Sequence, residues 1–144
     1  MNIALGADHA GFALKQQIAE TLRQAGHTVI DKGTDSATST DYPDYAGAVG
    51  RAVAEGAADR GILVCSTGAG MAIAANKVNG VRAASIVDTD TAKLSREHND
   101  ANVIAFGQRL IGIEVAREAL KVFLKTPFEG GRHEGRVAKL SREK

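Results

Sequence analysis

Short apolar runs alternate along the chain with longer stretches in which apolar residues recur every three or four positions. The short runs are rich in β-branched residues and end at glycine or polar residues, which is typical of buried strands. The longer stretches have the periodicity of amphipathic helices. This pattern predicts five strands, at residues 3–6, 28–31, 61–65, 82–87 and 102–106.

The helices are predicted between these strands. After the first strand, Phe12, Ile18 and Leu22 recur at helical spacing, and Gly26 provides a stop. Pro43 fits the first turn of a helix, where its missing N–H costs no hydrogen bond. The later helices are predicted at residues 43–54, 70–78, 89–98 and 111–124, followed by a charged helix after Pro127.

This alternation predicts the α/β fold class, with helices on both faces of a five-stranded parallel sheet and right-handed crossovers. A chain of 144 residues suits one domain, so residues 1–144 are interpreted as a single domain. The C-terminal tail, residues 127–144, is charged and carries few apolar residues. We expect it either to lie loosely on the surface or to dock on a partner subunit.

Composition and charge exclude several classes of protein. The net charge is +1 and aromatic residues make up 4% of the chain, so neither a basic surface nor a ladder of stacking rings is available for nucleic acid. No apolar run approaches the length of a membrane span and no signal pattern opens the sequence, which favours a cytoplasmic protein. One cysteine cannot form an intrachain disulfide, and no metal site is expected.

That cysteine, Cys65, stands where the third predicted strand gives way to a glycine-rich turn, in the run GILVCSTGAG. A parallel strand ends at the carboxyl edge of its sheet, where open α/β folds bind ligands, and the following turn directs amide N–H groups there. A helix N-terminus also favours a thiolate, which acts as a base or a nucleophile. The alternative is that Cys65 is a small buried side chain without a chemical role.

Three further clusters are candidates for a site. Asp8 and His9 follow the first strand at the same edge, although an aspartate there is also a common helix cap. If the first and third strands are neighbours, both residues share a crevice with Cys65. His98 ends a predicted helix, where the helix dipole alone explains a histidine, and Asn99 offers the donor and acceptor that hydroxyl recognition needs.

Arg132 and Arg136 form the last cluster. They are four residues apart and lie on one face of the predicted tail helix. They are interpreted either as part of a solvated charged surface or as a pair of guanidinium groups that binds phosphate.

An ordered series of segments now points to a family. GADHAGFALK, DKGT, DYPDYA, ILVCSTGAGMAIAANK, VRAA, LSREHNDANVIAFGQR and EGGRHEGRV resemble the type B ribose-5-phosphate isomerases, whose family includes galactose-6-phosphate isomerase subunits and some allose-6-phosphate isomerases. The resemblance implies a Rossmann-like three-layer α/β/α sandwich, usually a homodimer or a pair of dimers. It implies interconversion of an aldose phosphate and a ketose phosphate, here ribose 5-phosphate and ribulose 5-phosphate, through a cis-enediolate without metal or cofactor.

The resemblance also implies roles for single residues. Cys65 matches the base that moves a proton between C1 and C2, and Thr67 and His98 match groups that open the sugar ring, with His98 as proton donor or acceptor. The implied substrate contacts are the anion-hole residues Ser66, Thr67, Gly68, Ala69 and Gly70, together with Asp8, His9, Asn99, Arg109 and the phosphate-binding Arg132 and Arg136. The sequence leaves open whether these two arginines serve their own subunit or a neighbour.

Ser66 departs from the family, which commonly has glycine at this position. If the position requires a positive φ, serine adds strain of about 1 kcal/mol or shifts the loop.

Other functions remain as alternatives. These alternatives are an isomerase of a six-carbon sugar phosphate, a noncatalytic subunit and a nucleotide-binding module. The last is suggested by the run from Gly68 to Gly70 with Asp88 beyond it. The last alternative is weakened by Ile73, which replaces the third glycine of a dinucleotide-binding motif.

Overall fold

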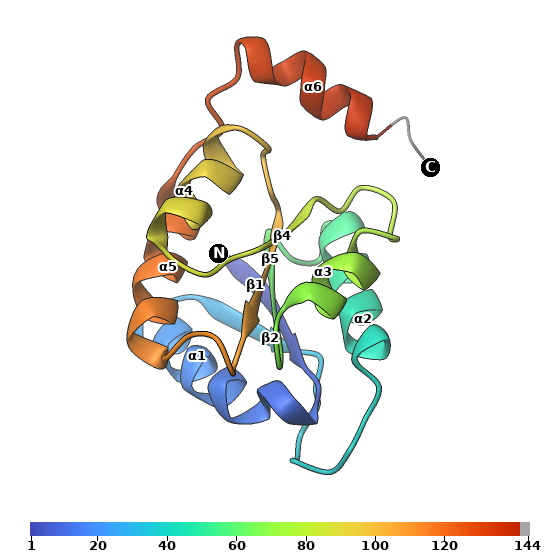
Figure 1. The fold of residues 1–144 in the computed structure, drawn as a ribbon, viewed down its shortest axis with the longest axis vertical. Helices are drawn as coiled ribbons and strands as arrows, with labels where there is room; N and C mark the ends of the chain where they lie inside the picture. Colours follow the sequence, from blue (N-terminus) through green and yellow to red (C-terminus); the bar gives the residue numbers. More distant parts are fainter. Residues whose placement is uncertain (142–144) are drawn as a thin grey trace.

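Five parallel strands form one sheet (Figure 1). The computed structural model describes residues 1–141. The strands are β1 (Asn2–Ala7), β2 (Thr28–Asp31), β3 (Arg60–Cys65), β4 (Ala83–Ser85) and β5 (Val103–Gly107). Their order across the sheet is β2-β1-β3-β5-β4. The three central strands are almost entirely buried, as parallel strands covered on both faces must be.

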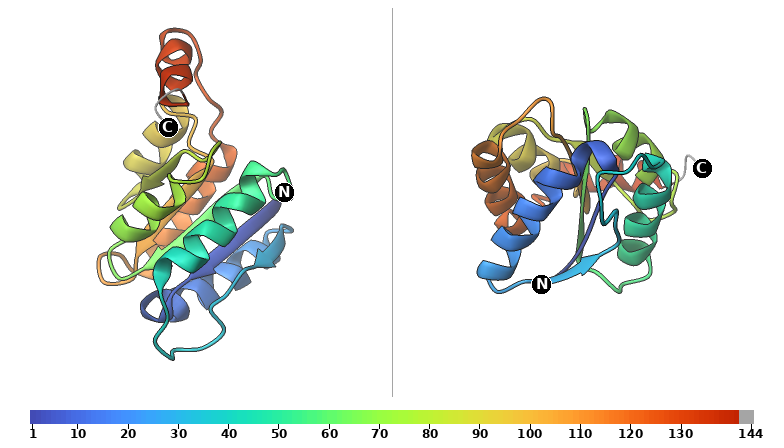
Figure 2. Two further views of the ribbon diagram at one scale, coloured as in Figure 1. Left: turned by 90° about the vertical axis from the view of Figure 1, so that its right-hand side faces the viewer. Right: turned by 90° about the horizontal axis from the view of Figure 1, so that it is seen from below.

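Helices cover both faces of the sheet. They are η1 (His9–Gly11), α1 (Phe12–Gln24), α2 (Tyr42–Ala54), α3 (Ala69–Ala75), α4 (Thr89–Glu97), α5 (Ile113–Lys125) and α6 (Arg132–Leu140). One face carries α1, α4 and α5, and the other carries α2 and α3 (Figures 1 and 2). Right-handed crossovers produce this division. The connections through α2 (β2 to β3) and α3 (β3 to β4) run toward the β4 side of the sheet, whereas those through α1 (β1 to β2) and α4 (β4 to β5) run toward the β2 side.

The predicted α/β class, the five strands and their alternation with helices are confirmed, and the boundaries differ by a few residues. The largest difference among the strands is β4, which is shorter than the predicted 82–87. It is an edge strand bonded to β5 alone. Ile86 still donates to the carbonyl of Ala105, but the amide of Val87 donates to Thr91 Oγ1 at the start of α4. The helix cap therefore ends the strand.

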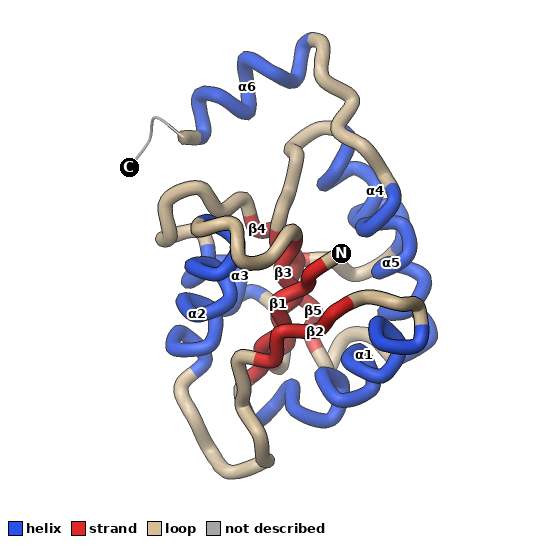
Figure 3. The backbone as a smooth tube through the Cα atoms, turned by 180° about the vertical axis from the view of Figure 1, so that it is seen from behind, coloured by secondary structure: helices blue, strands red, loops and turns tan. Residues whose placement is uncertain are grey.

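The C-terminal helix α6 stands apart from the sandwich (Figures 1, 2 and 3). It contacts the sandwich through His133, which is buried and whose ring stacks on that of His98. Arg132, Arg136 and Leu140 are exposed. The last three residues of the predicted tail, 142–144, lie outside the described residues. No helix within residues 1–141 combines the length and apolar character needed to cross a membrane.

A buried ion pair joins α1 to β2. Lys15 is 1% exposed, and its Nζ lies 2.7 and 2.8 Å from the two carboxylate oxygens of Asp31, which is 35% exposed. Asp31 also accepts a hydrogen bond from the amide of Gly33. Gly33 and Thr34 bond to the backbone of Ala7, at the end of β1. The ion pair therefore holds the segment after β2 against the carboxyl edge of the sheet.

The two partners of this pair are expected to respond differently to substitution. Asp31→Asn leaves the buried ammonium of Lys15 without a counter-charge, so it should lower the free energy of unfolding by about 3–5 kcal/mol. Lys15→Met removes the buried charge and leaves a carboxylate that water reaches, so its cost should be about 1 kcal/mol or less. Urea denaturation at neutral pH measures both values, and equal losses would contradict this account.

Candidate functional site

The ends of β1 and β3 bring the first candidate residues together. β1 and β3 are paired neighbours, as the shared crevice required. Cys65 is the last residue of β3, and the amide of Asp8 donates to the carbonyl of Val64 beside it. Arg109 follows β5, and its amide donates to the carbonyl of Ser66. We call Asp8, His9, Arg109 and residues 65–70 the carboxyl-edge group.

The thiol of Cys65 lies beneath the glycine-rich turn. Cys65 is 5% exposed, and its Sγ accepts a hydrogen bond from the amide of Gly68 at 3.1 Å. Gly68 has a φ of +86°, a conformation that L side chains rarely adopt. The turn therefore places a backbone N–H dipole against the sulfur, which is the polarity that a thiolate needs.

The same turn presents free amides. Within residues 1–141, the amides of Ser66, Thr67 and Gly70 donate to no hydrogen-bond acceptor. Among residues 1–141, Asp100 is the one non-glycine residue with a positive φ. Ser66 therefore does not adopt the left-handed conformation, and the strain considered for it does not arise. The turn therefore keeps the donors that an oxyanion requires, although a side chain stands at position 66.

Close packing fixes the turn from both sides. A Cβ on Gly107 would lie 2.6 Å from the carbonyl carbon and oxygen of Thr67. A Cβ on Gly70 would lie 2.7 Å from the ring of Tyr42, at the start of α2. Tyr42 was not among the residues predicted for the site. The DYP motif placed it at a helix start, but only the fold shows that its ring lies over Gly70.

Asp8 and His9 are held by local hydrogen bonds. The Oδ1 of Asp8 accepts from the amides of Ala10 and Gly11 at 3.0 and 3.1 Å, so this carboxylate caps η1, which is the alternative considered for it. His9 is exposed, and its Nδ1 accepts from the amide of Thr40 at 3.1 Å. That bond requires the proton of a neutral imidazole to sit on Nε2, the nitrogen free to meet a ligand.

The remaining candidates lie at the opposite edge of the sheet. In the β3–β5 pairing, Val103 is opposite Gly61 and Gly107 is opposite Cys65, so the turn before β5 lies at the amino edge. The length of β3 separates the edges by about 17 Å, at about 3.3 Å per residue. We call His98, Asn99, Arg132 and Arg136 the amino-edge group. Cys65 is thus far from the guanidinium groups of Arg132 and Arg136 in its own chain.

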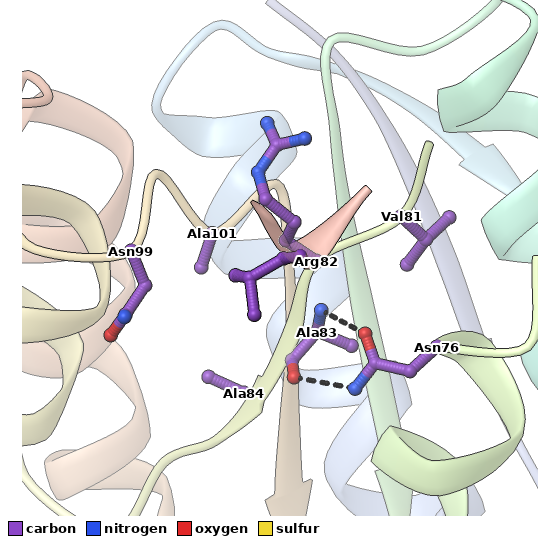
Figure 4. A pocket seen from close by; sticks show the side chains of 8 residues that line it. Asn76, Val81, Arg82, Ala83, Ala84, Asn99 and Ala101 are labelled. Atoms are coloured by element: carbon purple, nitrogen blue, oxygen red, sulfur yellow. Dashed lines mark hydrogen bonds between the residues drawn. The ribbon is translucent and has the colours of Figure 1, made fainter. Parts of the chain in front are cut away.

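Two adjoining pockets mark the amino-edge group. One, of about 260 Å³, is lined by His98, Asn99, His133, Arg136, Val137 and Leu140. The other, of about 440 Å³, lies next to β4, where the side-chain amide of Asn76 bonds both backbone groups of Ala83 (Figure 4). Asn99 and Leu140 line both pockets. The pockets therefore follow the space between α6 and the sandwich.

His133 lies within the predicted Arg132–Arg136 cluster but was given no role, and Glu129 was not predicted at all. The rings of His98 and His133 stack with centroids 4.4 Å apart and planes 17° apart, and the Nε2 of His133 lies 3.5 Å from Glu129. Ligand atoms of the three residues lie within 4.8 Å of one another. Imidazole lone pairs lie in the ring plane, however, so two stacked rings cannot direct them at one metal ion. The stacking instead orients His98.

Comparisons with known proteins cover nearly the whole chain. The family model described as Ribose/Galactose Isomerase matches residues 3–140. Ribose-5-phosphate isomerase B of Escherichia coli is 52% identical over 94% of this chain and 91% of that protein. D-erythrulose-4-phosphate isomerase of Pectobacterium atrosepticum is 45% identical over 97% of this chain and 93% of that protein. The structure of Clostridium thermocellum Ribose-5-Phosphate Isomerase B has a TM-score of 0.97 and 48% identity, covering 99% and 96%.

Gly107→Ala tests whether the back of the turn is as close-packed as the distances indicate. The new Cβ should push Thr67 outward, lower the free energy of unfolding by about 1–3 kcal/mol and shift the amide resonances of residues 66–68. Gly112→Ala is the matched control, because its Cβ meets no atom within 4 Å. Unchanged resonances in Gly107→Ala would show that the turn does not depend on this contact.

Proposed function

The chain belongs to the ribose/galactose isomerase family, and from this premise we propose that it interconverts ribose 5-phosphate and ribulose 5-phosphate. The observation that carries the proposal is Cys65 at the end of β3, with the amide of Gly68 on its sulfur and free amides beside it. These are a base and an oxyanion site, the two elements that an enediolate mechanism needs.

The proposed reaction moves one proton between adjacent carbons. The thiolate of Cys65 removes the proton from C2 of the open-chain aldose, the electron pair forms a C1–C2 double bond, and negative charge develops on O1. The amides of residues 66–70 stabilise that charge, which is larger in the transition state than in the substrate. Return of the proton to C1, with transfer of the hydroxyl proton from O2 to O1, gives the ketose.

Ring opening precedes this step. A proton must leave the O1 hydroxyl of the furanose while another reaches the ring oxygen, and His98 and Thr67 have the chemistry for this exchange. Arg132 and Arg136, one turn apart on α6, bind the phosphate and position the sugar without taking part in bond changes.

These roles require residues from both edges of the sheet, so the proposed site is completed by a second copy of the chain. The carboxyl-edge group of one copy would face the amino-edge group of the other, in a homodimer or a pair of dimers. Exposed apolar side chains support such a contact near each group. Ile73 on α3 is 64% exposed beside the carboxyl-edge group, and Leu140 on α6 is 53% exposed beside the amino-edge group.

The alternatives are less favoured. The family match spans residues 3–140, which leaves little support for a nucleotide-binding module. Six-carbon sugar phosphates are alternative substrates to be compared with ribose 5-phosphate, as is the four-carbon substrate named for the Pectobacterium relative. Cys65, Thr67 and His98 are all present, which argues against a noncatalytic subunit. The cytoplasmic location stays a prediction from the sequence.

The purified chain alone should isomerise ribose 5-phosphate with a higher kcat/KM than allose 6-phosphate, galactose 6-phosphate or erythrulose 4-phosphate. Cys65→Ala should lower kcat for the preferred substrate by about 10²–10⁴-fold, because general base catalysis is lost while the fold remains. Coupled assays and thermal unfolding of both proteins measure this. Normal turnover by Cys65→Ala would remove the thiol from the mechanism, and preference for another sugar would reassign the substrate.

The shared site predicts complementation between two defective chains. Arg136→Ala should raise KM, because it removes a phosphate contact. When Cys65→Ala and Arg136→Ala chains are co-expressed in equal amounts, about a quarter of the sites should combine two native groups, as random pairing in a symmetric oligomer requires. Activity at low substrate should then exceed that of either variant alone. A mixture with only the average activity of its components would place the whole site within one chain.

A further inference from the structure

A buried guanidinium lies directly behind the amino-edge group. Arg96, in the last turn of α4, is 4% exposed. Its Nη1 donates to Asp100 Oδ1 and to the carbonyl of Ala101, both at 2.7 Å, and its Nε donates to the carbonyl of Thr126 at 3.0 Å. A charged side chain is rarely so buried unless it is paired, so these acceptors determine where the guanidinium sits.

Asp100 closes the turn on which His98 and Asn99 lie. Its φ is +47°, and its carboxylate bonds Arg96 on one oxygen and Arg82 on the other, at 2.7 and 3.4 Å. The Nε of Arg82 also donates to the carbonyl of Asp100 at 2.8 Å. His98 and Asn99 therefore lie in a short turn between Arg96 and its ion-pair partner, so we expect a change in that pair to shift both residues.

The same guanidinium holds the segment that carries α6. Thr126, which accepts from Arg96, directly follows α5, and the amide of Glu129 donates to the carbonyl of Glu97 at 3.1 Å. Four residues beyond Glu129, His133 stacks on His98. α6 otherwise stands apart from the sandwich, so the direction of Arg132 and Arg136 depends on these contacts (Figure 2).

We propose that Arg96 is a positioning residue that joins the His98–Asn99 turn and the α6 segment into one unit and so presents the amino-edge group to a second copy of the chain. This inference rests on the proposed function. Arg96 lines neither pocket of this group, so it acts through Asp100, Ala101 and Thr126 rather than on the sugar. Its planar fork makes three bonds to acceptors on two segments, a geometry that lysine cannot reproduce.

Arg96→Lys keeps the charge and most of the volume but loses the fork. It should lower kcat/KM for ribose 5-phosphate by about 10–100-fold, because a displacement of about 1 Å at a site has effects of this size. Arg60→Lys is the matched control. Arg60 is a partly buried arginine in the same region, but its guanidinium donates to the carbonyl of Asp59 and to neither the turn nor the α6 segment. Its kcat/KM should stay within about threefold of the native value.

Complementation separates positioning from general damage to the fold. In equal co-expression with Cys65→Ala, Arg96→Lys should restore about a quarter of the native sites, because its own intact carboxyl-edge group meets the native amino-edge group of the other chain. If Arg96 supported the whole fold, or its own Cys65, the mixture would stay inactive. Arg96→Met, which removes the buried charge and leaves Asp100 paired with Arg82, provides a milder variant with the same expected pattern should Arg96→Lys not fold.

The outcomes are distinguishable. Native kcat/KM in Arg96→Lys overturns the inference. Loss of activity without complementation also overturns it if Arg136→Ala complements Cys65→Ala in the same series, because the site is then shared and Arg96 acts elsewhere. If neither variant complements, the shared site itself fails and the inference fails with it. Loss of activity in Arg96→Lys, with complementation and a native-like Arg60→Lys, supports it.

Discussion

A parallel sheet separates the beginnings of its strands from their ends, and this constraint governs the protein. Residues placed after β1, β3 and β5 meet at one edge, whereas the turn between α4 and β5 lies at the other. No side chain spans a distance of about 17 Å, so the proposed base at the first edge and the proposed phosphate-binding arginines at the second cannot act on one small sugar within a single chain. A site that uses both groups therefore links activity to assembly.

Each edge is supported by an ion pair whose cation is buried and which touches no predicted site residue except through the backbone. Lys15 and Asp31 hold the segment after β2 against the end of β1, next to Asp8. Arg96 and Asp100 hold the turn at the amino edge. Burial, and then the charge of Arg96, lower the pKa of the neighbouring Arg60, while Asp100 and Asp59 act in the opposite direction. Loss of either carboxylate would leave a buried cation without its counter-charge, so both supports are costly to break from that side.

The sequence predicted which residues have suitable chemistry better than it predicted the distances between them. Cys65, Gly68 and Asp8 were recognisable because strand ends and glycine turns have local signals, and their shared edge followed once β1 and β3 were neighbours. His98 was recognisable as a polar helix end, but strand order and direction had to be known before its distance from Cys65 could be stated. The contacts of Tyr42 and His133 could not be predicted, because an aromatic ring over a glycine and a stacked imidazole pair join segments that are distant in sequence.

Cys65 is buried by the glycine-rich turn of its own chain, which determines the surroundings of its sulfur. In the proposed mechanism, a thiolate that faced open water would be strongly hydrated, and loss of that hydration would add to the barrier for removing the carbon proton. In this structure the sulfur is covered by the turn, and the amide of Gly68 is its hydrogen-bond donor. The amides of Ser66, Thr67 and Gly70 stay free for the developing oxyanion. A fixed set of dipoles needs no reorganisation when charge appears, so in the proposed mechanism the turn would act through its backbone amides, which a serine at position 66 retains.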